Sequence, residues 1–278
     1  MAMVDLRRLA NKLACLRRRA LPAGWRDALR QVLILASCYA VYDLARLLVH
    51  GREAAAMANA QTIINAEKSL HLYVEPAVQT AAGHVHAVVA SMDWFYANVH
   101  LPATILTLVL IYLYRHETFV SFRNAFLAMN ALALTFFALF PVAPPRLVPT
   151  SGVVDTLYLY STTNYRSGVL SMVTDQYAAF PSLHIGYALF LSIAVWLLTG
   201  NRSARALAAV YPVVVLAVVV ITGNHYLIDV VGGVAVVSVA FALTRGFAPQ
   251  VAPAPLMVRV CDDERSARAV GPRRGAER

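Results

Sequence analysis

His225 and Asp229 are the residues of this sequence whose types and spacing point most directly to chemistry. They lie four residues apart in "TGNHYLIDVVGG" (residues 222–233), so on a helix they share one face. A carboxylate held against one imidazole nitrogen fixes the tautomer and leaves the other nitrogen free to act as a nucleophile. The pattern indicates an activated histidine, and an ordinary helix-stabilising pair is the alternative.

His184 is the second candidate histidine and lies at the end of "PSLH" (residues 181–184), where an apolar run begins. Proline favours the first position of a helix, which predicts that a helix starts at Pro181. Its first backbone N–H groups would be unpaired at the positive end of the helix dipole, which is a favourable site for phosphate. Ser182 would add a hydroxyl donor, and His184 would protonate the departing group. A capping or interfacial histidine is the alternative.

Arg146 supplies a cation in "FPVAPPRL" (residues 140–147). The prolines stiffen the backbone and fix the direction of the arginine, whose guanidinium group can hold two phosphate oxygens in its fork. A single arginine does not define a site, so its meaning depends on where the fold places it.

The composition predicts that transmembrane helices position these residues. Of the 278 residues, 59% are hydrophobic and 14% are charged, which is typical of an integral membrane protein. We therefore expect an all-α, polytopic membrane protein with six transmembrane helices and with outer interfacial helices. The predicted spans are residues 29–49, 94–114, 119–140, 183–198, 206–221 and 226–247. Asp43 and Arg46 interrupt the first span, for which a surface helix is the alternative.

The predicted organisation has three parts. Residues 1–28 would form a basic cytoplasmic N-terminus, residues 29–247 a six-span catalytic membrane domain, and residues 248–278 a disordered cytoplasmic tail. The bias toward Ala, Val and Arg is typical of a GC-rich bacterial genome. The predicted location is therefore a bacterial inner membrane, with both termini cytoplasmic and the active site extracytoplasmic.

The net charge of +9 is distributed asymmetrically along the chain. On the side predicted to be cytoplasmic, lysine and arginine number eight in residues 1–30, two in 115–123, two in 202–205 and seven from residue 245 onward. The outer side holds five. This is the positive-inside pattern, so the basic surface is expected to face anionic lipid headgroups and not nucleic acid.

Two stretches between the spans are expected on the outer side. Residues 53–92 predict two helical pieces that are broken around "YVEPAV" and lie at the outer interface, although an ordinary packed linker fits equally well. Their apolar side chains would face lipid or protein, and these are Ile63, Ile64, Leu70 and Leu72. The long, tyrosine-rich connection at residues 141–181 is typical of a lid or binding loop.

Other histidines of the sequence could bind a metal ion or line a substrate pocket. His84 and His86 lie on different faces of a helix and have no further ligand at a supporting spacing, so we expect no metal site and no cofactor. Tyr96 and His100, near the outer end of the second span, would line a headgroup pocket or anchor the helix at the interface.

The topology brings the three candidate segments together. With the N-terminus in the cytoplasm, the end of the third span and the starts of the fourth and sixth spans face the same outer surface. Two histidines, an aspartate, an arginine and a helix N-terminus would then converge, and phosphoryl chemistry is the best single explanation for that set.

The order and spacing of these motifs resemble a known family. "PSLH" followed about forty residues later by "HYLID" is similar to the second and third motifs of the type 2 phosphatidic acid phosphatase superfamily. "APPR" and "NHYLIDVVGG" look closer to its inositol phosphorylceramide synthase-like branch. The resemblance covers roughly residues 90–245.

The resemblance implies a role for each candidate residue. His225 would be the nucleophile that becomes phosphohistidine, and Asp229 would orient it. His184 would be the general acid for the departing alcohol, while Ser182 and Arg146 would bind phosphate oxygens.

The sequence departs from the phosphatases of that superfamily at three motif positions. The Ser-Arg pair that precedes their nucleophile is replaced by Val218 and Val219, and the lysine of their first motif is replaced by Leu139. The synthase-like branch also lacks these cations. Arg166 is our candidate for the missing charge, and a solvated loop arginine is the alternative.

The expected function is extracytoplasmic transfer of a phosphoryl group or phosphorylated head group on a phospholipid or polyprenyl phosphate, with a polyol such as inositol as a possible acceptor. Hydrolysis by a lipid phosphate phosphatase is the first alternative, because both reactions share the covalent step. A non-catalytic membrane protein that binds anionic lipids is the second.

Overall fold

The computed structural model describes residues 21–48, 51–160 and 177–244, and the regular elements of this part of the chain are all helices, joined by loops and without a β-strand. The longer helices are α2 (Trp25–Leu48), α3 (Glu53–Ser69), α4 (Glu75–Gly83), α5 (His86–Asn98), α6 (His100–Tyr114), α7 (His116–Leu139), α10 (Leu183–Leu198), α11 (Arg202–Ile221) and α12 (Leu227–Leu243). Two short turns are η1 (Pro145–Leu147) and α8 (Thr156–Tyr160).

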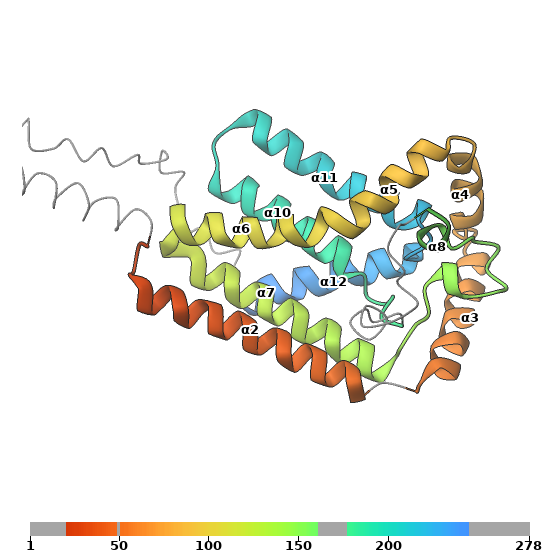
Figure 1. Cartoon of the computed structure of the whole chain (residues 1–278), viewed down its shortest axis with the longest axis horizontal. Coiled ribbons are helices and arrows are strands. Elements are labelled where there is room, and N and C mark those ends of the chain that lie inside the picture. The colour runs from red at the N-terminus through yellow and green to blue at the C-terminus, as the bar shows by residue number, and fades with distance from the viewer. Residues whose placement is uncertain (1–20, 49–50, 161–176, 245–278) are drawn as a thin grey trace, which may run out of the picture.

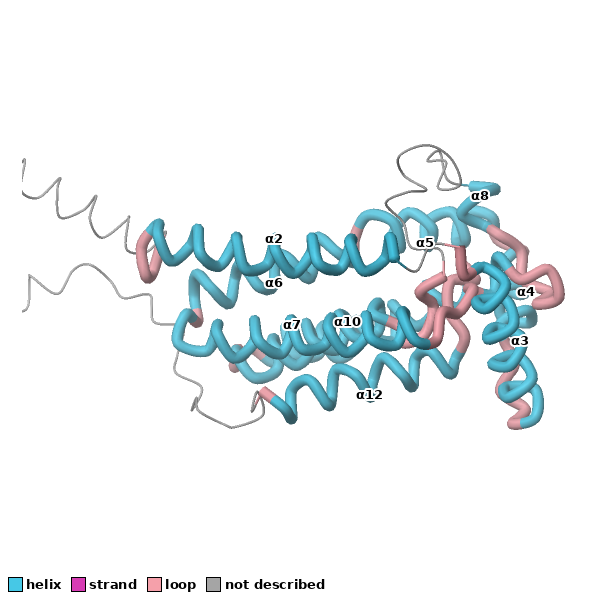
Figure 2. Tube along the Cα trace, turned by 90° about the horizontal axis from the view of Figure 1, so that it is seen from below, coloured by secondary structure: helices cyan, strands magenta, loops and turns pink. Residues whose placement is uncertain are grey.

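The long helices form a bundle that is closed at one end by the outer helices. In Figure 1 and Figure 2, α2, α6, α7, α10 and α12 run side by side along the long axis of the molecule. Helix α11 packs against α10, while α3 and α4 stand across the end of the bundle where α12 begins. The element order therefore brings segments far apart in the sequence to one end of the bundle.

The outward surface of the bundle is apolar. Large hydrophobic side chains on α11 and α12 are exposed, including Leu207 (72%), Val213 (64%) and Val231 (68%). Exposed apolar area on this scale is expected of helices that face lipid. The chain is therefore membrane-embedded.

Two of the described helices, α7 and α11, are each long and apolar enough to cross a membrane. The bent pair α5 and α6 makes a third candidate span if it is counted as one, and α10 and α12 are shorter apolar helices.

The prediction of one continuous helix over residues 94–114 is wrong. Helix α5 ends at Asn98, α6 begins at His100, and the two are bent by 43°. Pro102 explains the break, because in a continuous helix its ring would clash with the carbonyl group of Asn98, four residues earlier. In the first turn of α6, where backbone N–H groups have no helical partner anyway, the same proline is tolerated.

The predicted break around "YVEPAV" separates α3 from α4, and Pro76 lies in the first turn of α4. Ile63 and Ile64 are buried against the protein, whereas Leu70 and Leu72 are exposed. Other predictions fall on residues outside the described ranges. These are the N-terminus up to residue 20, the tail after residue 244, and Arg166.

Helices α10 and α12 approach each other closely through two glycines of "HYLIDVVGG". A Cβ atom on Gly233 would lie 2.4 Å from the backbone oxygen of Ser182, and one on Gly232 would lie 2.7 Å from the ring of Phe180. Real Cβ atoms do not approach other atoms this closely. The two glycines therefore permit the distance at which the start of α10 meets the first turns of α12.

This close approach predicts the effect of adding a single methyl group. Gly233→Ala should lower the free energy of unfolding by about 1–3 kcal/mol, because the helices must separate to accept the side chain. Thermal unfolding of the purified protein in detergent measures the change. Gly83→Ala is the control, since a Cβ atom at Gly83 meets nothing within 4 Å. Equal melting temperatures for the two variants would contradict the prediction.

Candidate functional site

The "FPVAPPRL" and "PSLH" segments are joined by a short piece of parallel pairing. The amide of Val142 donates to the carbonyl oxygen of Tyr177 at 2.9 Å, and the amide of Ala179 donates to the carbonyl oxygen of Val142 at 3.1 Å. The chain leaving α7 is thereby held next to the chain entering α10.

Both segments are also bonded to the "TGNHYLID" segment. The amide of Arg146 donates to the carbonyl oxygen of Gly223 at 2.9 Å, and the amide of Ser182 donates to that of Asp229 at 3.0 Å. Gly223 has φ of +67°, which ends α11 with a left-handed turn that favours glycine. Three segments separated in sequence are thus linked pairwise by backbone hydrogen bonds.

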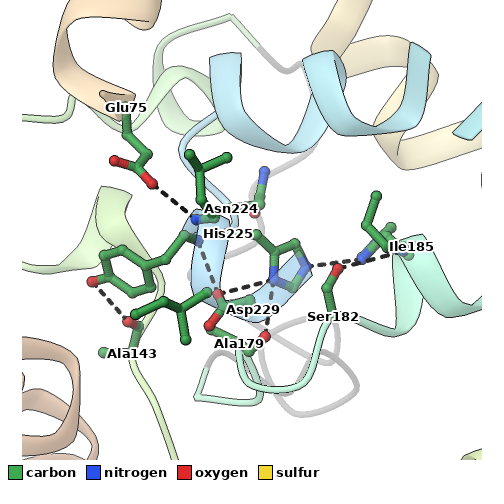
Figure 3. A network of polar contacts seen from close by, with 12 residues as sticks. Glu75, Ala143, Ala179, Ser182, Ile185, Asn224, His225 and Asp229 are labelled. Carbon is green, nitrogen blue, oxygen red and sulfur yellow. Dashed lines mark hydrogen bonds and ion pairs between the residues drawn. The ribbon is translucent and has the colours of Figure 1, made fainter. Parts of the chain in front are cut away.

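His225 and Asp229 contact each other at the start of α12. The Nδ1 atom of His225 lies 2.9 Å from the carbonyl oxygen of Ala179 and 3.3 Å from Oδ2 of Asp229 (Figure 3). Both neighbours are acceptors, so Nδ1 carries the hydrogen and Nε2 keeps its lone pair. The same carboxylate oxygen accepts the amide of Tyr226 at 2.9 Å, which fixes Asp229 as well.

His184 faces the nitrogen that this tautomer leaves free. Its Nδ1 atom lies 3.1 Å from Nε2 of His225, and because that atom is an acceptor, the hydrogen of this contact belongs to His184. The ring of His184 stacks on Tyr96, with centroids 4.5 Å apart and planes at 23°. The N–H group of one imidazole is therefore directed at the free lone pair of the other.

A further histidine lies behind His184. The ring centroid of His100 is 4.8 Å from that of His184 and 5.5 Å from that of Tyr187. His100 is buried, and its Nδ1 atom is 3.5 Å from the hydroxyl group of Tyr211. The sequence left two interpretations of Tyr96 and His100 equally open, pocket lining and interface anchoring. In the structure both rings contact the ring of His184, so both residues lie against the site.

Ser182 is the N-cap of α10, so the prediction that the helix starts at Pro181 is wrong. The helix begins at Leu183, and the hydroxyl oxygen of Ser182 accepts the amide of Ile185 at 3.4 Å. At the cap position the hydroxyl oxygen of serine can accept an amide that has no partner inside the helix. Proline has no side-chain oxygen and cannot do so. Ser182 is fully buried beside the two histidines, and its oxygen serves first as an acceptor.

Arg146 contacts Asn224, the residue that precedes His225. Its Nε atom donates to Oδ1 of Asn224 at 2.9 Å, and one terminal nitrogen pairs with Asp155 at 3.3 Å. Val218 and Val219, in place of the Ser-Arg pair, are both buried, and Val219 belongs to an apolar cluster. The cation next to Asn224 and His225 therefore comes from η1, and these two positions of α11 supply none.

Several residues of this site were missed by sequence reasoning. Asn224 and Asp155, which hold Arg146, were not singled out, and neither were three polar residues of the outer helices, Glu67, Glu75 and Gln79. Gln79 donates to the carbonyl oxygens of Val154 and Ile221, at 2.9 and 3.0 Å. The signal in the sequence was the presence of Glu and Gln among apolar residues, because polar side chains that become buried in such helices need specific partners.

Glu67 and Glu75 bind the start of α12. Oε1 of Glu75 accepts the amide of Leu227 at 2.9 Å, and Oε1 of Glu67 accepts the amide of Ile228 at 2.7 Å. Both side chains are fully buried. Burial and the neighbouring carboxyl of Glu75 raise the pKa of Glu67 to about 8.

Within the described ranges, no group of three or more His, Cys, Asp or Glu side chains is arranged to hold a metal ion. No curated protein and no solved structure matches the chain at a significant level. The family model of the PAP2 superfamily matches residues 61–243, which begins inside α3 and ends with α12. That match spans all three segments of the site and most of the chain, and the protein is therefore a member of the PAP2 superfamily.

Proposed function

We propose that this protein is a lipid phosphotransferase that works through a phosphohistidine on His225. Members of the family act on lipid phosphates, and the apolar bundle gives such a substrate access from the bilayer. The observation that carries the proposal is the 3.1 Å contact between Nδ1 of His184 and Nε2 of His225, with the tautomer of His225 fixed from the opposite side of its ring.

In the first step, Nε2 of His225 attacks phosphorus, a P–N bond forms, and the P–O bond to the lipid breaks. His184, which acts in its doubly protonated form, gives the hydrogen on Nδ1 to the departing oxygen and becomes neutral. The reacting phosphorus and the departing oxygen must lie between the two nitrogens, so substrate entry separates the rings. Asp229 stabilises the positive charge that His225 develops on bond formation.

In the second step, an acceptor hydroxyl attacks the phosphohistidine and His184 takes the proton of that hydroxyl. The P–N bond breaks and His225 returns to its starting tautomer. Inositol or a lipid hydroxyl as acceptor gives transfer, and water gives hydrolysis.

The phosphate oxygens would be bound by Ser182, by the first amides of α10 and by Arg146. The buried valines at positions 218 and 219 supply no cation, so we assign that role to Arg146, which the contact with Asn224 aims at the nucleophile loop. Arg166 remains our candidate for a second cation.

We further propose six spans, with this end of the bundle outside the cytoplasm. Helices α10 and α12 lie beside α7 and, at 16 and 17 residues, reach about 25 Å each. Arg115 and Arg202 lie at the opposite end of the bundle, where α7 and α11 begin, as the positive-inside pattern requires. The proposed location is a bacterial inner membrane.

Trapping the covalent intermediate tests the nucleophile. Purified protein mixed with phosphatidate labelled in its phosphate should carry an alkali-stable label on Nε2 of His225. His225→Ala should lose the label and slow turnover about a thousandfold or more, because the nucleophile is absent. His84→Ala, which alters an exposed histidine, should keep both. A label that survives in His225→Ala would refute the assignment.

The carboxylate that fixes the tautomer gives a second prediction. Asp229→Asn should slow formation of the phosphohistidine about 10³–10⁴-fold, since an amide can donate to Nδ1 and stabilise the wrong tautomer. Rapid-quench measurement of a single turnover records the rate. Asp27→Asn, near the start of α2, is the matched control. A loss of less than tenfold would show that Asp229 does not orient the nucleophile.

The acceptor is identified by the products. With labelled phosphatidate, added inositol, or diacylglycerol whose acyl chains differ from those of the substrate, should divert label into a phosphorylated acceptor, whereas free phosphate alone would identify a phosphatase. Wild-type protein that binds lipid phosphates but forms neither product would instead be a binding protein.

A further inference from the structure

Three carboxyl groups accept hydrogen bonds from the backbone at the start of helix α12. The amides of Tyr226, Leu227 and Ile228 are accepted by Asp229, Glu75 and Glu67, respectively. Acidic groups stabilise the positive end of a helix, and each bond satisfies an amide that has no partner inside the helix. Figure 3 shows Glu75 reaching this turn from α4.

The two glutamates have a second, unusual feature in common. Oε2 of Glu67 and Oε2 of Glu75 are buried and meet no hydrogen-bond partner among the described residues if both groups are ionised. The two groups bind the consecutive amides of Leu227 and Ile228, so they are neighbours. Two neighbouring buried carboxylates repel each other, whereas a single proton between them forms a hydrogen bond and removes one charge.

The other titratable groups around this pair do not remove the need for that proton. Asp229, on α12, adds a further acidic group, and its charge also raises the pKa of Glu67. Tyr73 faces the pair from the turn between α3 and α4, and Lys68 lies over the ring of Tyr73, 5.2 Å from its centroid. His225 contacts Asp229 on the opposite side.

We propose that Glu67 and Glu75 are positioning residues that share a proton and, by binding the first amides of α12, hold His225 and Asp229 at the geometry required for attack. The inference rests on the proposed role of His225. The two glutamates approach the start of α12 from α3 and α4 and contact no reacting atom. They would therefore act through the backbone of residues 225–229. Its loss should reduce the rate of phosphohistidine formation and leave the KM for the lipid phosphate unchanged.

The variant Glu67→Gln distinguishes the two roles of the Glu67 side chain, holding a proton and accepting the amide of Ile228. The glutamine oxygen still accepts the amide of Ile228, and its NH₂ group donates permanently to Glu75, so the variant imitates the protonated pair. Wild type should lose activity as Glu67 deprotonates above pH 8. The rate ratio of Glu67→Gln to wild type should therefore rise about tenfold from pH 6.5 to pH 9. Glu53→Gln, an exposed glutamate on α3, should give a constant ratio.

Glu67→Leu removes the acceptor and should lower the rate of phosphohistidine formation at every pH. Hydrogen exchange of the peptide that covers residues 224–232 should be faster in Glu67→Leu than in wild type, and unchanged in Glu67→Gln. A ratio that stays constant with pH, or unchanged exchange in Glu67→Leu, would overturn the proposal.

Stability gives a readout that needs no substrate. A buried carboxyl with a raised pKa stays protonated in the fold while the unfolded chain ionises, so the melting temperature of wild type should fall between about pH 4.5 and pH 8 and then level off. Glu67→Gln should lack the part of this fall that lies between about pH 6 and pH 8. If wild type forms no phosphohistidine with any lipid phosphate, the proposed function fails, and exchange and melting still decide the role of the pair.

Discussion

The hydrogen bond from the Ser182 amide to the Asp229 carbonyl oxygen joins the starts of α10 and α12, and the geometry of the two histidines depends on it. Backbones can come this close only where no Cβ atom intervenes, which is the contribution of Gly233. His184 and His225 each lie within a few residues of this bond, so the positions of the two backbones determine the distance between their rings. Side-chain rotation then provides the movement that substrate entry needs.

Buried polar groups in an apolar bundle are stable when they are hydrogen-bonded, and here most of them lie at the end of the bundle where α12 begins. Arg146 is held by Asn224 and Asp155, His225 by Ala179 and Asp229, and the first amides of α12 by the carboxylates beside it. The same contacts that satisfy these groups also restrict their orientation. A site preorganised in this way has little reorganisation to perform when charge develops on a phosphoryl group.

Local sequence patterns predicted the parts of this structure that depend on neighbouring residues. The apolar run at residues 183–198 became α10 with the same bounds. His225 and Asp229 are in contact, as their spacing predicted, but His225 precedes α12, which begins at Leu227, so the two residues do not share one helical face. Pro102 was overlooked and Pro181 was misjudged, because a proline is compatible with a helix start, a break or the residue before a cap. The glutamates above α12 were missed because their partners lie 152 and 161 residues further along the chain.

Those sequence separations have a consequence for biosynthesis. Glu67 and Glu75 leave the ribosome long before the amides of α12 that they bind. During membrane insertion the two carboxyl groups therefore stay hydrated until the start of α12 has been made. Under the proposed mechanism His225 needs its contact with Asp229, so a partly made chain that lacks α12 cannot yet attack the surrounding lipids.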